Sequence, residues 1–482
     1  MSAAAERPAE GGQQTLDALL AIVRDVLSGE QAWVVGGVVR DRLLGRAPAR
    51  PDVDLVVAGD PESAARRVRD GAARGSAVFA LSDAFGAWRV VGPGGGWQVD
   101  VSRLHADGLE ADLRSRDLTL NAIAEPLGGG GLVDPTGGVD DLGRGTLRMA
   151  GPGSFAADPL RILRVARLAS LLAMEPEPGT VRAAREHAAA LAQVSGERVF
   201  AELRGIVGAE RPSQAMRLLA GLAATDVVLP ELSALRGVEQ TVYHHLDAHD
   251  HTLEVLDRVA EIEHEPRAVV GELAAPVAEL LREPLADDLD RGGALRWGAL
   301  LHDIAKSRTQ IELGEGSYGF PGHDREGAAM TREILSRLRA SERLRAHVSA
   351  LARHHLRAGF LVRERPLSRR VVHGYLVTCE PVEADVTLLS IADRLATRGR
   401  KAQVSIELHL EVALPLLADA LRRHRDGPAE PLVRGDQLAQ ALGLRPGPRL
   451  GELLAEIAAA QYAGEVTSAA EAVEHARRVL GG

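Results

Sequence analysis

The stretch that decides how the chain begins to fold is Gly36-Gly37-Val38-Val39-Arg40-Asp41, followed by Asp52-Val53-Asp54. The apolar residues 33–35 before the glycines predict a buried strand, and residues 38–44 after them predict a short helix. Asp52 and Asp54 begin a second predicted strand, on which residues two apart point to the same face. Two carboxylates so close together repel each other unless a hard cation lies between them, and Mg²⁺ prefers such oxygen ligands.

The glycine pair strengthens this interpretation. Gly36 and Gly37 lie where a strand turns into a helix, and there backbone amides can approach a phosphate, with Arg40 one turn further on. An Asp-x-Asp pair alone would fit an exposed strand end equally well, but the combination favours a nucleoside triphosphate site. Asp100, on the outgoing strand of a predicted hairpin, offers a third carboxylate that could position or deprotonate an attacking hydroxyl. A surface aspartate at a strand end is the alternative for Asp100.

Composition sets the class of protein. The chain has 482 residues, of which 45% are hydrophobic and 26% charged, and this indicates a globular protein of two to four domains. Aromatic residues make up only 3%, so a sheet that stacks RNA bases on rows of aromatic side chains is not expected. The net charge of −10 excludes a uniformly basic coat but not local basic patches. The single cysteine, Cys379, and the lack of a long apolar run predict a cytoplasmic protein without a membrane span.

The chain divides into four predicted regions of an α+β protein. A small α/β unit covers residues 1–150, a helical neck 151–240, a helical and histidine-rich domain 241–425, and a helical tail 426–482. Within the third region, the proline- and acid-rich stretch 263–293 resembles a surface insertion.

Five ordered motifs resemble those of the class II tRNA nucleotidyltransferases and bacterial poly(A) polymerases. The Gly36 to Asp54 stretch resembles the first motif, and the others are Arg116-Asp117-Leu118-Thr119-Leu120-Asn121-Ala122, Asp134 to Arg148, Asp158 to Arg164, and Glu197 to Leu203. The resemblance implies a DNA polymerase beta-like head that uses Mg²⁺ at Asp52 and Asp54. It also implies CTP and ATP as substrates and the 3′ end of tRNA as the acceptor. The nucleotide-binding residues that it implies are Gly36, Gly37, Arg40, Arg116, Asp117, Asn121, Asp158, Arg161, Arg164 and Arg167.

The fourth motif can also be interpreted from its chemistry. Asp158, Arg161 and Arg164 recur at intervals of three, which predicts one helical face after the helix-starting Asp-Pro. A carboxylate accepts hydrogen bonds and a guanidinium donates them, so an Asp-Arg pair can select cytosine and adenine over uracil and guanine without a template. The resemblance gives this part to Asp158 and Arg161, and Arg164 and Arg167 are expected to face phosphate or to hold the pair.

Three departures from the family pattern affect the expected specificity. Ala157 stands where an acid usually precedes the reading aspartate, and Ser115 stands where an arginine usually precedes Arg116. Arg103 and Arg116 are only 13 positions apart, whereas members that complete the whole CCA end carry a longer flexible loop between these positions. The short segment resembles that of CC-adding members. Addition of CC alone is therefore an alternative to full CCA addition, as is poly(A) synthesis.

A second constellation consists of histidines and aspartates in the third region. In chain order these are His251, His302-Asp303, His323, His354-His355 and Asp393. Imidazole nitrogen and carboxylate oxygen together suit a divalent metal. A lone His-Asp pair is usually structural, but this order resembles the HD phosphohydrolase superfamily.

That resemblance implies metal ligands and a second activity. His251, His302, Asp303 and Asp393 are the expected ligands of a divalent transition metal or Mg²⁺, with His249 as a competitor for the place of His251. His323 and either His354 or His355 are expected at a second metal or at the substrate phosphate. The domain is expected to act as a phosphatase or phosphodiesterase, and an inactive tRNA-binding scaffold or a phosphohydrolase with a relic head are the alternatives. The sequence gives no indication of the oligomeric state.

Overall fold

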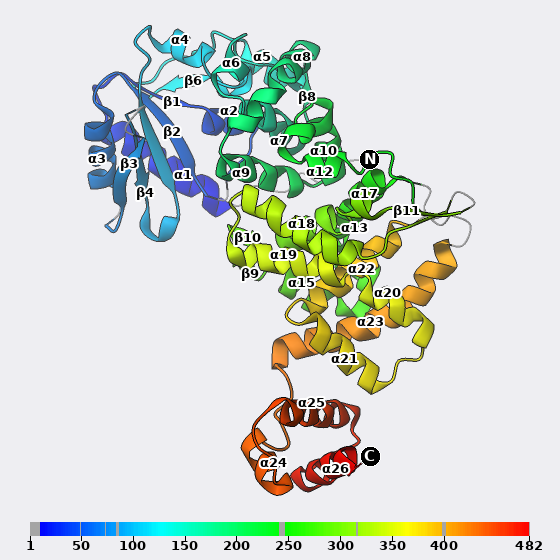
Figure 1. Ribbon diagram of the computed structural model, residues 1–482. Helices are drawn as coiled ribbons and strands as arrows, with labels where there is room; N and C mark the ends of the chain where they lie inside the picture. The colour runs from blue at the N-terminus through cyan, green and yellow to red at the C-terminus, as the bar shows by residue number, and fades with distance from the viewer. Residues whose placement is uncertain are drawn as a thin grey trace. The chain divides into compact units, whose positions relative to one another are not determined.

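A computed structural model describes residues 10–48, 50–72, 74–82, 86–240, 246–314, 317–397 and 402–481. It confirms the α+β class, since one six-stranded sheet lies in the N-terminal part and helices dominate the rest (Figure 1). The chain separates into two compact units, residues 1–194 with 219–224 and residues 195–218 with 225–482. The four predicted regions are a finer division, and they stay a prediction. Among the described residues, no helix is both long and apolar enough to cross a membrane.

The sheet of the first unit contains the predicted strands that carry Asp52, Asp54 and Asp100. Its strands are β1 (Ala32–Val35), β2 (Asp52–Val57), β3 (Ala77–Ser82), β4 (Ala87–Val91), β5 (Gln98–Arg103) and β6 (Ala124–Pro126). They are arranged in the order β3-β4-β5-β2-β1-β6, so β3 and β6 are the edges. β2 and β5 pair in parallel, whereas the other neighbours pair antiparallel.

The two faces of this sheet are covered differently. Alternate residues of β2, namely Val53, Leu55 and Val57, are buried. Helix α3 (Pro61–Gly71) packs on β3, β4 and β5 and also contacts α1 (Glu10–Val26). On the opposite face, Val35 and Val56 form a cluster with Leu113, Ala122 and Ala124. Asp52 and Asp54 therefore lie on that opposite face, since they alternate with the residues of the Val53 set.

Short helices complete the first unit. They are α2 (Gly37–Leu43), α4 (Leu109–Arg114), α5 (Gly138–Arg144), α6 (Ser154–Ala157), α7 (Arg161–Leu172) and α8 (Pro178–His187). The prediction that Asp158, Arg161 and Arg164 share one helical face is wrong for Asp158, which lies before the helix. Asp158 has extended dihedral angles, φ −149° and ψ 102°, between α6 and α7, so α7 begins only at Arg161.

Four helices form the centre of the second unit. They are α13 (Ala248–His264), α16 (Arg291–Leu301), α19 (Glu342–His354) and α22 (Glu383–Leu395), and α16, which carries the fully buried Trp297, contacts the other three. Around them lie α9 (Gly196–Val207), α17 (Lys306–Thr309), α18 (His323–Arg337), α20 (Arg357–Leu361), α21 (Arg369–Cys379) and α23 (Ala402–Asp426). The tail helices α24 (Gly435–Leu442), α25 (Pro448–Ala463) and α26 (Ala469–Gly481) have a hydrophobic core of their own.

The expectation of a surface insertion at 263–293 is wrong. This stretch forms α14 (Pro266–Val270), α15 (Ala274–Leu281) and a small β-pair, and α15 packs against α16. Val270, Val277 and Leu280 are buried. The many acidic residues concealed an apolar stripe at helical spacing, which makes the segment part of the core.

Candidate functional site

The turn between β1 and α2 brings the main chain up to a carboxylate. Gly36 has φ +77°, a backbone conformation that residues other than glycine rarely adopt. A Cβ at Gly36 would lie 2.9 Å from Asp54 Oδ2 and 3.7 Å from an Arg116 guanidinium nitrogen. Glycine is therefore required at position 36 for two reasons: its positive φ, and the lack of room for a Cβ. The turn, Asp54 and Arg116 lie close together.

The predicted carboxylates come together on one face of the sheet. Asp52 and Asp54 are two residues apart on β2, and Asp100 of β5 is the direct register partner of Asp54. Burial, followed by the charge of Asp52, raises the pKa of Asp54 to about 6, with Asp100 acting in the same direction and Arg116 against it. Oxygen donors of like charge at this spacing are the set that Mg²⁺ prefers, so the residues fit the expected metal.

An arginine that sequence reasoning missed holds the third carboxylate. Arg89 of β4 faces Asp100 in the antiparallel register of β4 and β5. Its guanidinium donates two hydrogen bonds to Asp100, of 2.7 and 2.6 Å. The cross-strand alternation of charges at positions 89 and 100 could have indicated this pair, because both residues belong to the predicted hairpin. Gln98 similarly donates to Asp52 over 2.8 Å.

A chain of hydrogen bonds links the glycine turn to the predicted base-reading helix. The buried Arg40 makes two bonds to Asp41 and donates to Asn121 Oδ1 over 2.8 Å. Asn121 donates to the buried Asp117 over 3.1 Å, and Arg164 donates to the other oxygen of Asp117 over 3.3 Å. Burial opposes the ionised form of Asp117, but Arg164 and the Leu118 amide outweigh it and lower its pKa. The four predicted residues are therefore one network.

Arg161 has main-chain partners in this structure. It donates to the carbonyls of Ser115 (2.8 Å) and Arg116 (3.1 Å) and lies 3.3 Å from Ser154 Oγ. Burial lowers its pKa, whereas the carboxylates of Asp117 and Asp158 act to raise it. Asp158 accepts from the Leu160 amide over 3.2 Å at the entry to α7. These two main-chain contacts hold the Arg161 side chain in place. One of them is at Ser115, the position where the family resemblance leads us to expect a second arginine.

Two further predicted features have clear positions. Arg167 lies partly buried on α7, one turn beyond Arg164. In the third motif, Asp134 accepts from the amides of Gly138 and Val139 and so caps α5, which assigns this motif a structural part.

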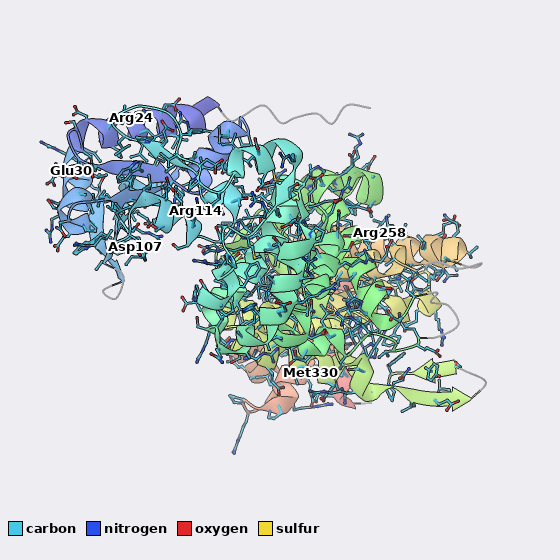
Figure 2. The ribbon with its side chains drawn as sticks, turned by 90° about the horizontal axis from the view of Figure 1, so that it is seen from above. Arg24, Glu30, Asp107, Arg114, Arg258 and Met330 are labelled. Carbon is cyan, nitrogen blue, oxygen red and sulfur yellow. The ribbon has the colours of Figure 1, made fainter. Side chains whose placement is uncertain are left out.

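The short segment between β5 and the second motif is ordered as a turn and a helix. Gly108 donates to the carbonyl of His105, and α4 follows directly at Leu109–Arg114. Arg116 then bonds Asp112 of α4 over 3.2 and 3.3 Å. Figure 2 labels Asp107 and Arg114 near the two ends of this segment. A turn and a six-residue helix thus make up most of the segment between Arg103 and Arg116.

The histidines and aspartates of the second unit form two adjacent groups. His251, His302 and Asp393 offer ligand atoms within 4.8 Å of one another, and so do Asp303, His323 and His355. Asp303 is close to both groups, since one of its oxygens lies 3.1 Å from His302 Nε2 and the other 3.4 Å from His323 Nε2. The helices α13, α18, α19 and α22 each supply or adjoin one member, and α16 is followed directly by two, His302 and Asp303.

The ring orientation of three histidines suits metal binding. His302, His323 and His355 each use Nδ1 in a hydrogen bond of 2.7–2.8 Å to a backbone carbonyl three residues earlier. A carbonyl can only accept, so the proton is on Nδ1 and Nε2 is left as a ligand atom. The Nε2 atoms of His302 and His323 are buried and, among the described residues, have no partner with hydrogen-bond geometry. These unsatisfied buried atoms fit a divalent cation of the kind expected.

The charges around this centre also favour a cation. Burial alone would lower the pKa of His302, but the Asp303 and Asp393 carboxylates outweigh it and raise that pKa. Burial acts to raise the pKa of Asp393, but the hydrogen bond from His251 over 2.9 Å and the charges of His251 and His302 together outweigh it and hold that pKa well below its usual range. Burial, with His302 nearby, lowers the pKa of His355 to about 4, so this ring is neutral near pH 7.

The structure separates the competing histidines. His354 lies outside both groups, and its Nδ1 accepts from Arg357 over 2.9 Å. His249 lies in a different group with Asp247 and Asp250, where Asp247 is already the N-cap of α13.

Lys306 is a further residue of this centre, and the sequence pattern did not indicate it. It is buried, and its ammonium lies 2.6 Å from both Asp303 Oδ2 and Gln240 Oε1. Its spacing of one helical turn from Asp303 could have indicated this contact.

Comparisons with known proteins identify the families that the chain resembles. The family described as "Poly A polymerase head domain" matches residues 32–83 and 97–148. The family described as "Probable RNA and SrmB- binding site of polymerase A" matches 173–235, and "HD domain" matches 248–398.

Individual relatives extend over nearly the whole chain. An A-adding tRNA nucleotidyltransferase of Deinococcus radiodurans is 36% identical over 447 residues, covering 92% of this chain and 94% of its own. A CC-adding tRNA nucleotidyltransferase of Thermus thermophilus is 32% identical, covering 92% of each chain. Among solved structures, an apo CCA-adding enzyme superposes with a TM-score of 0.64 at 20% identity, covering 99% of this chain and 97% of its own. This last likeness concerns the fold alone.

Proposed function

Because the chain belongs to the CCA-adding tRNA nucleotidyltransferase family, we propose that its head adds C residues to the 3′ end of tRNA from CTP and that Asp52, Asp54 and Asp100 carry the reaction. The observation that carries this proposal is the direct register of Asp54 with Asp100, beside Asp52 and the glycine turn. Mg²⁺ at Asp52 and Asp54 would supply charge stabilisation for the transferring phosphoryl group.

The chain's own residues account for the proton and the bonds. Asp100, held by Arg89, accepts the proton of the terminal 3′-hydroxyl of the tRNA. The hydroxyl oxygen then forms a bond to the α-phosphorus of the nucleotide, and the bond to the leaving pyrophosphate breaks. Arg116, which lies beside Asp54 and Gly36, would face the triphosphate.

Selection of the base rests on the hydrogen-bonded network of the head. Asp158 offers an acceptor and Arg161 offers donors, which is the pattern that cytosine and adenine satisfy. Asp117, Asn121 and Arg164 hold the entry to α7, and Arg40 connects that network to the glycine turn by a hydrogen bond to Asn121.

The proposed substrate also bears on where the protein acts. Because tRNA is a cytoplasmic molecule, the proposed function supports a cytoplasmic location.

The short α4 segment supports CC addition over full CCA addition. A turn and a six-residue helix occupy the place of a long flexible loop, which leaves little freedom to reshape the pocket from CTP to ATP. Addition of a single A is the second candidate, because the Deinococcus relative at 36% identity is an A-adding enzyme.

The test uses three tRNA substrates that lack CCA, end in C, or end in CC, each incubated with CTP alone and with ATP alone. We expect extension of the first two by CTP and no extension of the third. If AMP is added to the tRNA that ends in CC and CTP extends none of the three, the protein is an A-adding enzyme and CC addition is excluded. Long A tails on unrelated RNA would indicate a poly(A) polymerase.

For the second unit we propose a metal-dependent phosphohydrolase activity. Its support is the pair of buried, unsatisfied Nε2 atoms at His302 and His323, together with the Asp303 carboxylate between the two ligand groups. A divalent transition metal or Mg²⁺ would supply an activated water there. Lys306, which contacts Asp303, would neutralise the charge of a substrate phosphate. Hydrolysis of a 2′,3′-cyclic nucleotide, with and without a chelator, tests this activity.

A further inference from the structure

One row of register partners runs across four strands of the head sheet. Asp54 of β2 faces Asp100 of β5, Asp100 faces Arg89 of β4, and Arg89 faces Phe79 of the edge strand β3. Residues directly opposite in a sheet share a face, so all four side chains project on the side of the carboxylates. The row ends at the open edge of the sheet.

Phe79 is exposed on that face. The residue is 46% exposed, so part of its phenyl ring is open to solvent. The face that α3 covers is occupied by the alternate residues, such as Trp88, whose ring lies under Arg66 of α3. The chain has only six phenylalanines, and one of them is placed in line with the carboxylates.

The two directions along the row have different neighbours. Toward β1, Asp54 meets Gly36 and Arg116, which belong to the proposed triphosphate site. In the opposite direction the row continues through Asp100 and Arg89 to Phe79. The attacking hydroxyl must approach from the side away from the leaving pyrophosphate, so this second direction is left for the RNA acceptor.

We propose that Phe79 stacks against the 3′-terminal base of the acceptor RNA, while Asp100 faces the 3′-hydroxyl of the same nucleotide. The inference rests on the proposed function of the head. Phe79 lies two strands beyond Asp100, roughly 10 Å away at the usual strand spacing, a separation that a sugar and its base can bridge. A phenyl ring stacks on any base, so this contact holds the end of the RNA without selecting its sequence. Arg89 is a positioning residue that keeps Asp100 in the row.

The test is a double-mutant cycle in which one change is made in the protein and the other in the RNA. The quantity measured is the equilibrium dissociation constant of labelled tRNA in the absence of nucleotide. The two changes are Phe79→Ala and removal of the terminal base of the RNA to leave an abasic 3′ nucleotide. Stacking predicts that each change weakens binding by about tenfold and that both together weaken it no further than one alone. Phe79→Trp is expected to bind like the unchanged protein.

The matched control is Phe360→Ala, which removes a phenyl ring that is 66% exposed on α20. It is expected to leave tRNA binding unchanged. If the two changes of the cycle multiply, or if Phe79→Ala binds normally, Phe79 does not stack on the terminal base. Failure of the unchanged protein to extend tRNA would instead contradict the proposed function, and the binding cycle would still give its own answer.

Discussion

Arg89 of β4 and Asp100 of β5 face each other across the head sheet and are joined by two hydrogen bonds of 2.7 and 2.6 Å. On its other side, Asp100 is the register partner of Asp54. Arg89 is therefore linked to Asp54 only indirectly, by way of the Asp100 carboxylate. A bidentate contact fixes both the position and the charge of the group that it binds.

This relationship predicts a non-additive pair of variants. Asp100→Asn is expected to lower kcat by about 100-fold because it removes the proposed proton acceptor, and Arg89→Met to lower it by about tenfold because Asp100 loses its position. In the Asp100→Asn background, Arg89→Met is expected to have little further effect. Steady-state kinetics of CTP incorporation measures all four proteins, and independent, multiplying effects would show that Arg89 does not act through Asp100.

The glycine turn gives a matched pair of substitutions. Gly36→Ala is expected to abolish nucleotide addition, because the new Cβ would lie 2.9 Å from Asp54 Oδ2. Gly45→Ala also places a side chain at positive φ, +65° against +77°, but its Cβ meets nothing within 4 Å. Gly45→Ala is expected to lose about 1–2 kcal/mol of stability and to keep its activity. Gly36→Ala is expected to lose more stability as well as its activity, because Gly36 has ψ −139°, outside the left-handed helical region. Equal loss of activity in both would mean that strain, and not the contact with Asp54, is decisive.

Asp54 is expected to reduce the stability of the metal-free protein at neutral pH. Its pKa is about 6 in the folded state against 3.8 for the free group, so between these values the folded protein binds more protons than the unfolded chain. The free energy of unfolding therefore falls as the pH rises through this window, and the loss persists above it. Asp54→Asn should stabilise the head by about 1–3 kcal/mol at pH 7.5 in EDTA.

Calorimetric melting of the two proteins from pH 4 to pH 7.5 measures this difference. The stabilisation should be small near pH 4 and largest above pH 6, while the variant is inactive in nucleotide addition. A variant that is less stable than the unchanged protein at pH 7.5 would contradict the account of the Asp54 environment.

The second unit is expected to bind two metal ions. His323→Ala and His355→Ala should each lose the ion near Asp303 and should keep the ion of the group formed by His251, His302 and Asp393. His354→Ala should keep both, since His354 lies outside the two groups and is bound to Arg357. Metal content per chain after dialysis measures this, and loss of an ion in the His354 variant would revive the alternative that the sequence left open.

The head could be predicted in detail because its signals are local. The alternation at Asp52 and Asp54, the glycine turn and the hairpin that carries Asp100 all follow from residues close in the chain. Arg89 was missed because it becomes notable only when the register places it beside Asp100. The position of Asp158 outside α7 was missed because the spacing of three looked helical.

For the second unit, the sequence indicated which histidines and aspartates come together but not how they are grouped. The order of histidines and aspartates indicated a metal centre, whereas the assignment of His355 over His354 depends on how α19 ends and which ring faces Asp303. Adjacent residues at a helix end point in directions about 100° apart, and sequence alone does not fix which one faces inward. The buried helix α15 was missed because its apolar stripe lies within an acidic stretch.

The central claim is that Asp54 and its partners add cytidylate to the 3′ end of tRNA. Its most direct test is the extension of a tRNA that lacks CCA by the unchanged protein and by Asp54→Asn, with CTP and Mg²⁺. The account predicts addition of two C residues by the first and none by the second. Equal extension by both proteins, or no extension by the unchanged protein, would contradict it.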